Sequence, residues 1–170
     1  MEEIRIYVAD LAAYNNGTLH GVWVDACGEM DDIWEAVNQM LKSSPEEMAE
    51  EYAIHDYEGF GSVRLSEYEG LESAREKALF IDQHGVLGAA VLDRWCEDLE
   101  DAAKALEESY AGVYESLADY ARQLTEDTSE VPAHLEYYID YEKIGRDMEL
   151  GGDIYTIETA HDEVHIFWNH

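Results

Sequence analysis

Carboxylates are the most abundant reactive side chains in this sequence, and they occur along its whole length. Forty Asp and Glu residues face ten Lys and Arg residues, which gives a formal net charge of -30. At this density two carboxylates occur at almost any chosen spacing, so a pair of acids is no evidence for glycosidase-type acid and base chemistry. A nucleophile-elbow motif and a glycine-rich phosphate loop are both missing. We therefore predict a protein that is not an enzyme.

Histidines are most concentrated near the C-terminus, at His161, His165 and His170. If residues 163–168 form a strand, His161 and His165 could face the same way and bind a metal ion. The HExxH motif is missing, however, and the aromatic residues beside them favour ordinary packing. No EF-hand loop with its acidic ladder is present either. We expect neither a metal ion nor another cofactor.

The two cysteines and the apolar runs bear on where the protein works. Cys27 and Cys96 are too few and too far apart for a metal cluster or a disulfide framework, which favours a reducing cytosol. The longest apolar run, residues 86–92, is too short to span a bilayer, and the N-terminus begins with acids where a signal peptide would carry bases. We expect a soluble, cytoplasmic protein. Its charge would repel anionic membranes and nucleic acids, so we expect no membrane contact and no direct nucleic acid binding.

The first 61 residues have the pattern of a small α+β module. Residues 4–9 and 19–25 alternate as strands do, with an Asn-Asn-Gly turn signal between them. A third strand is expected at residues 52–56. Between the second and third strands, Asp31 or Asp32 could cap a helix that ends at Lys42 and turns these residues inward: Ile33, Val37, Met40 and Leu41. Ser44-Pro45-Glu46-Glu47 has the pattern of a capping box and predicts a further short helix.

Residues 66–126 are expected to be mainly helical, with breaks near Gly70, Gly85 and Gly112. We predict a helical middle module at residues 62–103 and a C-terminal α+β module at residues 104–170. The clearest helix, residues 97–110, turns an apolar stripe inward: Leu99, Ala102, Ala103, Leu106 and Tyr110.

The C-terminal module is expected to contain three short helices and a hairpin. Ser116 can cap a helix with Leu117, Tyr120, Ala121 and Leu124 on its inner face. Pro132 can open a second helix and Asp140 can cap a third, which Gly151-Gly152 would end. Residues 154–158 and 163–168 alternate as two strands around a His161-Asp162 turn. The predicted fold class is α+β, as an elongated chain of small modules: an N-terminal antiparallel sheet with helices, a helical middle, and C-terminal helices with a β-hairpin.

Acidic residues occupy the outward side of nearly every predicted helix. An acidic face on a single helix is usually explained by contact with water, but here that explanation must hold for every helix at once. We expect the following carboxylates to contact a cationic partner: Glu97, Glu100, Asp101, Glu107, Glu108, Glu115, Asp119, Glu126, Asp127, Glu136, Glu142 and Asp147. Twelve tyrosines are also present. Several of them lie on inward stripes and favour core packing, although a surface of aromatic and acidic residues could hold an arginine-rich partner through cation–π contacts and ion pairs.

The size of the charge suggests a specific kind of partner. Duplex DNA carries about one charge per 1.7 Å of its axis, so 30 negative charges correspond to roughly 15 base pairs, or about 50 Å of duplex. A compact domain of this length would have a radius of gyration of only about 15 Å. Spreading the charge at the density of DNA therefore favours small modules in a row, which together form an extended polyanion with a folded core.

Three segments resemble a known family. RIYVADLAAYNNGTLHGVWVDA near the N-terminus, SYAGVYESLADYARQL, and VPAHLEYYIDYEKIGRDMELGGDIYTI resemble the ArdA family of antirestriction proteins, and residues 132–146 are similar to the segment named in that family as its antirestriction motif. The resemblance implies a three-module, elongated, homodimeric DNA mimic, encoded by mobile genetic elements. It implies that the protein occupies the DNA-binding groove of type I restriction-modification enzymes, at the methyltransferase and specificity core. It also implies dimer contacts in the C-terminal module near Leu135, Tyr138 and Tyr141.

Two hypotheses follow from the charge. In the first, acidic side chains take the place of phosphates and competitively block a restriction enzyme, so binding weakens as salt rises and responds to neutralising Glu97, Glu100 and Asp101 together. In the second, the protein is an acidic soluble binding module or enzyme subunit from a high-salt cytoplasm, which the low lysine content fits. Stability against potassium chloride separates them, because a halophilic protein should unfold at low salt whereas the DNA mimic should stay folded.

Overall fold

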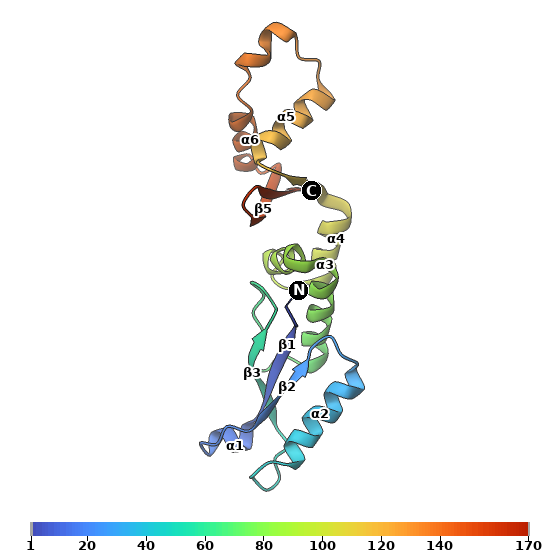
Figure 1. The fold of residues 1–170 in the computed structure, drawn as a ribbon, viewed down its shortest axis with the longest axis vertical. Coiled ribbons are helices and arrows are strands. Elements are labelled where there is room, and N and C mark those ends of the chain that lie inside the picture. The colour runs from blue at the N-terminus through green and yellow to red at the C-terminus, as the bar shows by residue number, and fades with distance from the viewer. Residues whose placement is uncertain (1, 170) are drawn as a thin grey trace. The chain divides into compact units, whose positions relative to one another are not determined.

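The computed structural model describes residues 2–169, and these residues form two compact units, divided between Leu99 and Glu100, which we describe separately (Figure 1). Both units combine helices with antiparallel sheets, so the predicted α+β class is confirmed. The division into modules 1–61, 62–103 and 104–170 stays a prediction. No helix among the described residues is long and apolar enough to cross a membrane.

The first unit is built on a three-stranded antiparallel sheet of order β2-β1-β3. Its strands are β1 (Arg5–Asp10), β2 (Gly21–Asp25) and β3 (Tyr52–Glu58), which confirms the three strands expected here. A bulge between Tyr7 and Val8 shifts the register of β1 against β3. Between β1 and β2 lies a helix that the sequence analysis missed, α1 (Leu11–Asn15), where the Asp10 carboxylate accepts a hydrogen bond from the backbone N–H of Ala13.

Helix α2 (Met30–Lys42) packs against β1 and β2 of this sheet (Figure 1). Ile33, Val37 and Met40 are buried as expected, but the cap residue is Glu29 and not Asp31 or Asp32. The prediction of a short helix after Ser44 is wrong. The segment is a turn in which the Ser44 hydroxyl accepts a hydrogen bond from the backbone N–H of Glu46, so the Ser-Pro-Glu-Glu pattern satisfies its donors without starting a helix.

Helix α3 (Leu71–Arg94) completes the first unit and is interrupted at Gly85, whose φ of 67° belongs to the left-handed region. The expected break near Gly85 is therefore confirmed, and glycine suits it because other residues pay a steric cost there. Phe60, Leu71 and Leu92 are almost completely buried and belong to the core of this unit. Gly70 directly precedes α3, as the expected break near it implied.

The second unit contains a three-stranded sheet of order β4-β6-β5. The hairpin of β5 (Ile154–Ala160) and β6 (Glu163–Trp168) was expected, but its partner β4 (Tyr110–Tyr114) was not. The helix expected at residues 97–110 instead comprises α4 (Leu99–Lys104) and the π-helical turn η1 (Ala105–Ser109), after which Tyr110 begins the strand. The helix ends earlier than predicted because of a tertiary contact: the segment from Tyr110 to Tyr114 pairs with the edge of β6.

Two helices cover one face of this sheet. They are α5 (Leu117–Thr128), capped by the Ser116 hydroxyl, and α6 (Tyr141–Leu150), capped by the Asp140 carboxylate, and both caps were predicted. The core between helices and sheet centres on Tyr120, Ile154, Val164 and Ile166. The α-helix expected after Pro132 is a 3₁₀ helix, η2 (Ala133–Tyr138), and none of its residues is buried.

Candidate acidic interaction surface

Almost all of the acidic side chains lie on the surface. Asp10 is buried and Glu46, Glu69 and Glu97 are partly buried, whereas every other Asp and Glu is exposed. Because helix caps and amphipathic stripes place apolar residues inward, the carboxylates of both units are left outside. The arrangement is therefore a distributed anionic surface.

On α4 and η1 the carboxylates alternate with buried alanines. Ala102 and Ala105 are buried, while the acids of this segment are exposed: Glu100, Asp101, Glu107 and Glu108. The amphipathic stripe predicted for this segment thus holds as far as the π-helical turn. Lys104 is also exposed and has no ion pair within residues 2–169. The segment presents a net negative surface.

Glu97 differs from its neighbours because its carboxylate is used inside the first unit. Lys77 is buried, and its Nζ lies 2.7 Å from Glu69 Oε1 and 2.9 Å from Glu97 Oε2. Burial alone would lower the pKa of Lys77, but hydrogen bonds to the two carboxylates raise it above its ordinary value. Burial alone would raise the pKa of Glu69, yet hydrogen bonds from Lys77 and Ser73 hold that pKa below its ordinary value. Glu97 precedes α4 with a φ of 67°, so it is not part of the predicted helix.

On α5 and near it, the predicted acids lie at the surface: Glu115, Asp119, Glu126 and Asp127. Only Glu126 of these has an ion pair within the described residues, with Arg122 at 3.1 Å one helical turn earlier. Both partners are more than half exposed, so this pair contributes little to stability. The remaining carboxylates of α5 stay available to a partner.

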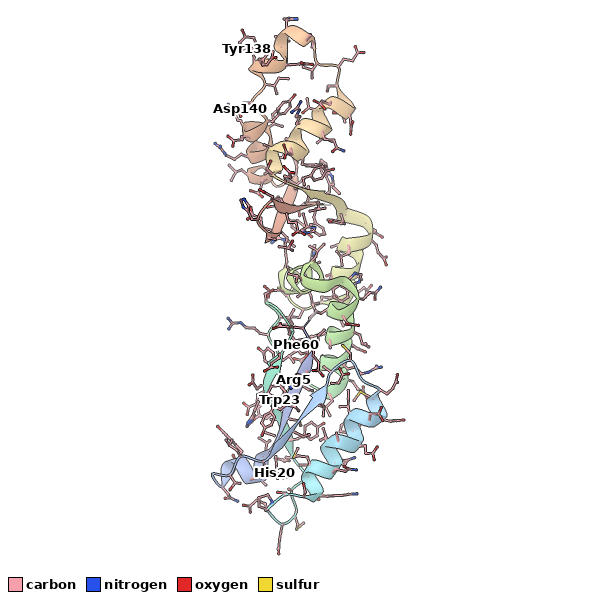
Figure 2. All side chains as sticks on the ribbon, in the orientation of Figure 1. Arg5, His20, Trp23, Phe60, Tyr138 and Asp140 are labelled. Carbon is pink, nitrogen blue, oxygen red and sulfur yellow. The ribbon has the colours of Figure 1, made fainter. Side chains whose placement is uncertain are left out.

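The segment before α6 exposes apolar residues along with acids. Leu135 is 44% exposed and Tyr138 is 84% exposed, whereas Tyr141 is partly buried. Figure 2 labels Tyr138 and Asp140 in this segment. Glu136, Glu142 and Asp147 are exposed as well. These residues were expected to contact a second copy or a target enzyme, and those roles stay predictions.

The two described histidines considered as metal ligands lie in different surroundings. His165 is buried, with Nδ1 2.6 Å from the Tyr110 hydroxyl and Nε2 2.9 Å from Thr159 Oγ1. Burial lowers the pKa of His165. His161 is exposed in the hairpin turn, and His170 lies outside the described residues. Among residues 2–169, no group of three or more His, Cys, Asp or Glu side chains could hold a metal ion.

Sequence reasoning missed both of these internal polar clusters. Lys77 lies within a helical stretch that otherwise shows no sign of a buried cation, although a lysine between alanines at the apolar positions Ala74 and Ala78 was a usable signal. The link between Tyr110 and His165 joins residues that are far apart in the sequence, and no local pattern predicts it. Both clusters involve a buried side chain, and the first takes Glu97 out of the predicted acidic surface.

One concave region of the second unit is lined by four carboxylates among its nine residues. It has a volume of about 320 Å³ and is lined by Glu115, Ser116, Leu117, Glu149, Thr156, Glu158, His161, Asp162 and Val164. Carboxylates at this density attract cations and cationic side chains.

Fold and surface together define an acidic α+β protein whose carboxylates face outward on both units. The family model for antirestriction protein (ArdA) matches residues 6–163 of the chain. The chain therefore belongs to the ArdA antirestriction family. A comparison with curated proteins finds no match.

Proposed function

We propose that this protein blocks type I restriction-modification enzymes by occupying their DNA-binding groove as an acidic mimic of DNA. Membership of the antirestriction family supports an antirestriction function. The observation that carries the finer proposal is the exposure of nearly all forty acids over both units. A groove that binds the DNA backbone has lysine and arginine side chains placed for phosphates, and carboxylates can pair with the same cations.

Competition without catalysis is the mechanism that fits these groups. Each exposed carboxylate forms a weak ion pair, and affinity accumulates over many such pairs. A second copy would double the number of carboxylates, and the exposed Leu135 and Tyr138 support a homodimer through the segment before α6. The dimer would then offer carboxylates for about 30 base pairs at the charge density of DNA.

Displacement of DNA tests the proposal directly. Labelled duplex bound to a purified type I methyltransferase core should be released by the full-length protein in proportion to its concentration. The apparent affinity should fall at least about tenfold as potassium chloride rises from 50 to 200 mM, because many ion pairs are screened. Circular dichroism over the same range should show an unchanged fold, whereas unfolding at low salt would favour the halophilic alternative. Absence of displacement by folded protein would reject the proposal.

Matched charge neutralisation locates the contacts. Changing Glu100, Glu107 and Glu108 together to glutamine should weaken competition about tenfold, given about 0.5 kcal/mol for each exposed ion pair. The same change at Glu47, Glu50 and Glu51 removes equal charge outside the predicted contact set and should cost clearly less. Equal losses from both triples would show that net charge alone determines affinity. Glu97 is unsuitable for this test because its neutralisation would leave the buried Lys77 short of a partner.

A further inference from the structure

Two rows of side chains cross one face of the first sheet. The register places Asp25 and Glu58 on either side of Arg5, and Trp23 and Asp56 on either side of Tyr7. Directly opposed residues on antiparallel strands point to the same face, as do residues two apart on one strand. We call these six residues the open-face array: Arg5, Tyr7, Trp23, Asp25, Asp56 and Glu58.

The array lies on the face of the sheet that α2 leaves uncovered. Ile6, Val8 and Val24 alternate with the array residues and are buried on the opposite face. The three acids of the array are exposed, and Trp23 is 36% exposed. Figure 2 labels Arg5 and Trp23 on their adjacent strands. The array is therefore an accessible surface of aromatic and charged groups.

A guanidinium group is already bound within this array. Arg5 Cζ lies 4.6 Å from the centroid of the Trp23 ring, and Arg5 Nε donates a hydrogen bond of 2.7 Å to Glu58 Oε2. The Tyr7 and Trp23 rings are 5.4 Å apart. Gly21 makes room for this arrangement, because a Cβ atom there would lie 2.7 Å from Cζ of Tyr7. The surface is thus shaped for a planar cation that stacks on an aromatic ring and pairs with a carboxylate.

Acidic groups next to the array exceed what Arg5 neutralises. An open cavity of about 500 Å³ beside it is lined by Glu2, Glu3, Arg5, Glu58 and Gly59. Glu58 pairs with Arg5, whereas Glu2, Glu3, Asp25 and Asp56 have no ion pair within residues 2–169. The cavity and its rim therefore keep a negative charge that favours another cation.

We propose that the open-face array and this cavity bind an arginine-bearing segment of a partner protein. The incoming guanidinium pairs with Glu2, Glu3 or Glu58 and contacts the exposed part of Trp23. Charge complementarity selects this occupant, since a second copy of this chain would bring acids against acids and a nucleic acid would bring phosphates. The site goes beyond the proposed function because it depends on an uncharged aromatic residue and not on the acids of α4, α5 and α6.

Nuclear magnetic resonance can test the site at the level of single residues. The probe is a capped peptide with two arginines separated by glycine, added to the full-length protein in 150 mM potassium chloride, with a matched lysine peptide as the comparison. Trp23→Phe identifies the indole N–H signal of Trp23. That signal should move with the arginine peptide and clearly less with the lysine peptide, because a planar guanidinium stacks on the ring. The indole signal of Trp95, which has a similar exposure of 38%, should stay in place.

Substitutions of Trp23 and Arg5 should change the affinity in opposite directions. Trp23→Ala should weaken the arginine peptide about two- to fivefold, the usual value of an exposed cation–π contact, with Trp95→Ala as its control. Lys42→Gln removes the same positive charge at an exposed position outside the array and serves as the control. Arg5→Gln should strengthen binding of the arginine peptide at least about twofold more than Lys42→Gln does, because it also leaves the Trp23 ring and the Glu58 carboxylate without their internal guanidinium partner. A purely structural role for Arg5 predicts no such gain.

Three results would overturn the proposal. The first is equal movement of the Trp23 and Trp95 signals when the arginine peptide is added. The second is equal affinity of the protein for the arginine and lysine peptides. Either result would show that net charge alone attracts the peptide. The third is a change in the sedimentation of the peptide-free protein in Trp23→Ala, which would make the face a contact between copies. Trp23→Phe keeps an aromatic ring and should retain most of the affinity if Trp23→Ala fails to fold. Each of these results is independent of whether the protein displaces DNA from a restriction enzyme.

Discussion

The two three-stranded sheets differ in how their faces are covered. In the first sheet, α2 covers one face and the other carries the open-face array. In the second sheet, α5 and α6 pack on the face of Ile154 and Ile166, and the opposite face buries Tyr155, Phe167 and His165 as well. A sheet of three strands thus has one accessible, charged face in the first unit, whereas both faces of the second sheet bury large side chains.

Side-chain chemistry follows this difference in burial. On the accessible face the carboxylates of Asp25, Asp56 and Glu58 are exposed to water, and Glu58 pairs with Arg5. The titratable side chain of His165 lies on the buried face of the second sheet. Both of its ring nitrogens form hydrogen bonds, one with Tyr110 and the other with Thr159. A buried group avoids the cost of desolvated charge by staying neutral. The first sheet thus carries a row of charged side chains across the middle of one face, whereas the carboxylates of the second sheet, Glu158 and Glu163, lie toward the ends of its strands.

Aromatic truncation on the two faces should give the largest contrast. Phe167 is fully buried and stacks on Tyr155 with ring centroids 5.0 Å apart, so Phe167→Ala should lower the free energy of unfolding by about 3–5 kcal/mol. Trp23→Ala on the accessible face should cost clearly less, since 36% of Trp23 is already exposed to water. Urea unfolding followed by circular dichroism measures both. Equal losses would mean that the two faces are equally buried in solution.

The close packing of α6 against α5 over the second sheet should depend on Gly145. A Cβ atom at this position would lie 2.8 Å from Leu117 Cγ and 3.3 Å from Leu117 O, so α6 approaches α5 more closely than alanine permits. We expect Gly145→Ala to lower the free energy of unfolding by about 1–3 kcal/mol despite the better helix propensity of alanine. Arg146→Ala, at the exposed neighbouring position of the same helix, serves as the control. A stabilised Gly145→Ala variant would contradict the close packing of the helices.

Acidification should affect the buried face through His165. Because burial lowers the pKa of His165 in the folded protein, the unfolded chain binds the proton first as pH falls. The contribution of His165 is therefore complete above its ordinary pKa of about 6.5 and decreases as pH falls toward the lower folded value. Between pH 7.5 and 5.5 the wild type should lose more stability than His165→Gln does, as measured by urea unfolding. Identical pH dependence of the two proteins would show that His165 does not couple protonation to folding.

Local patterns in the sequence were enough to predict the α+β class, the first sheet, the interrupted helix α3, the caps at Ser116 and Asp140, and the β5–β6 hairpin. These features depend on alternation, capping and glycine conformation, which act over a few residues. The net charge and the outward acids were also evident from composition and helical spacing. The resemblance to the ArdA family, which the family match confirms, came from the same local segments.

Tertiary structure decided the features that depend on contacts between distant residues. Tyr110 to Tyr114 became a strand because the edge of β6 was available to them, although the sequence predicted a helix that ends at Tyr110 and a break near Gly112. Glu97 became the partner of a buried lysine instead of a surface acid, since the chain that follows α3 places it 2.9 Å from Lys77, which lies in the first part of that helix. The open-face array required the register of three strands, which places Arg5 between Trp23 and Glu58. The sequence determined how many carboxylates the surface carries, and only the fold decided which charges are paired inside and which remain for a partner.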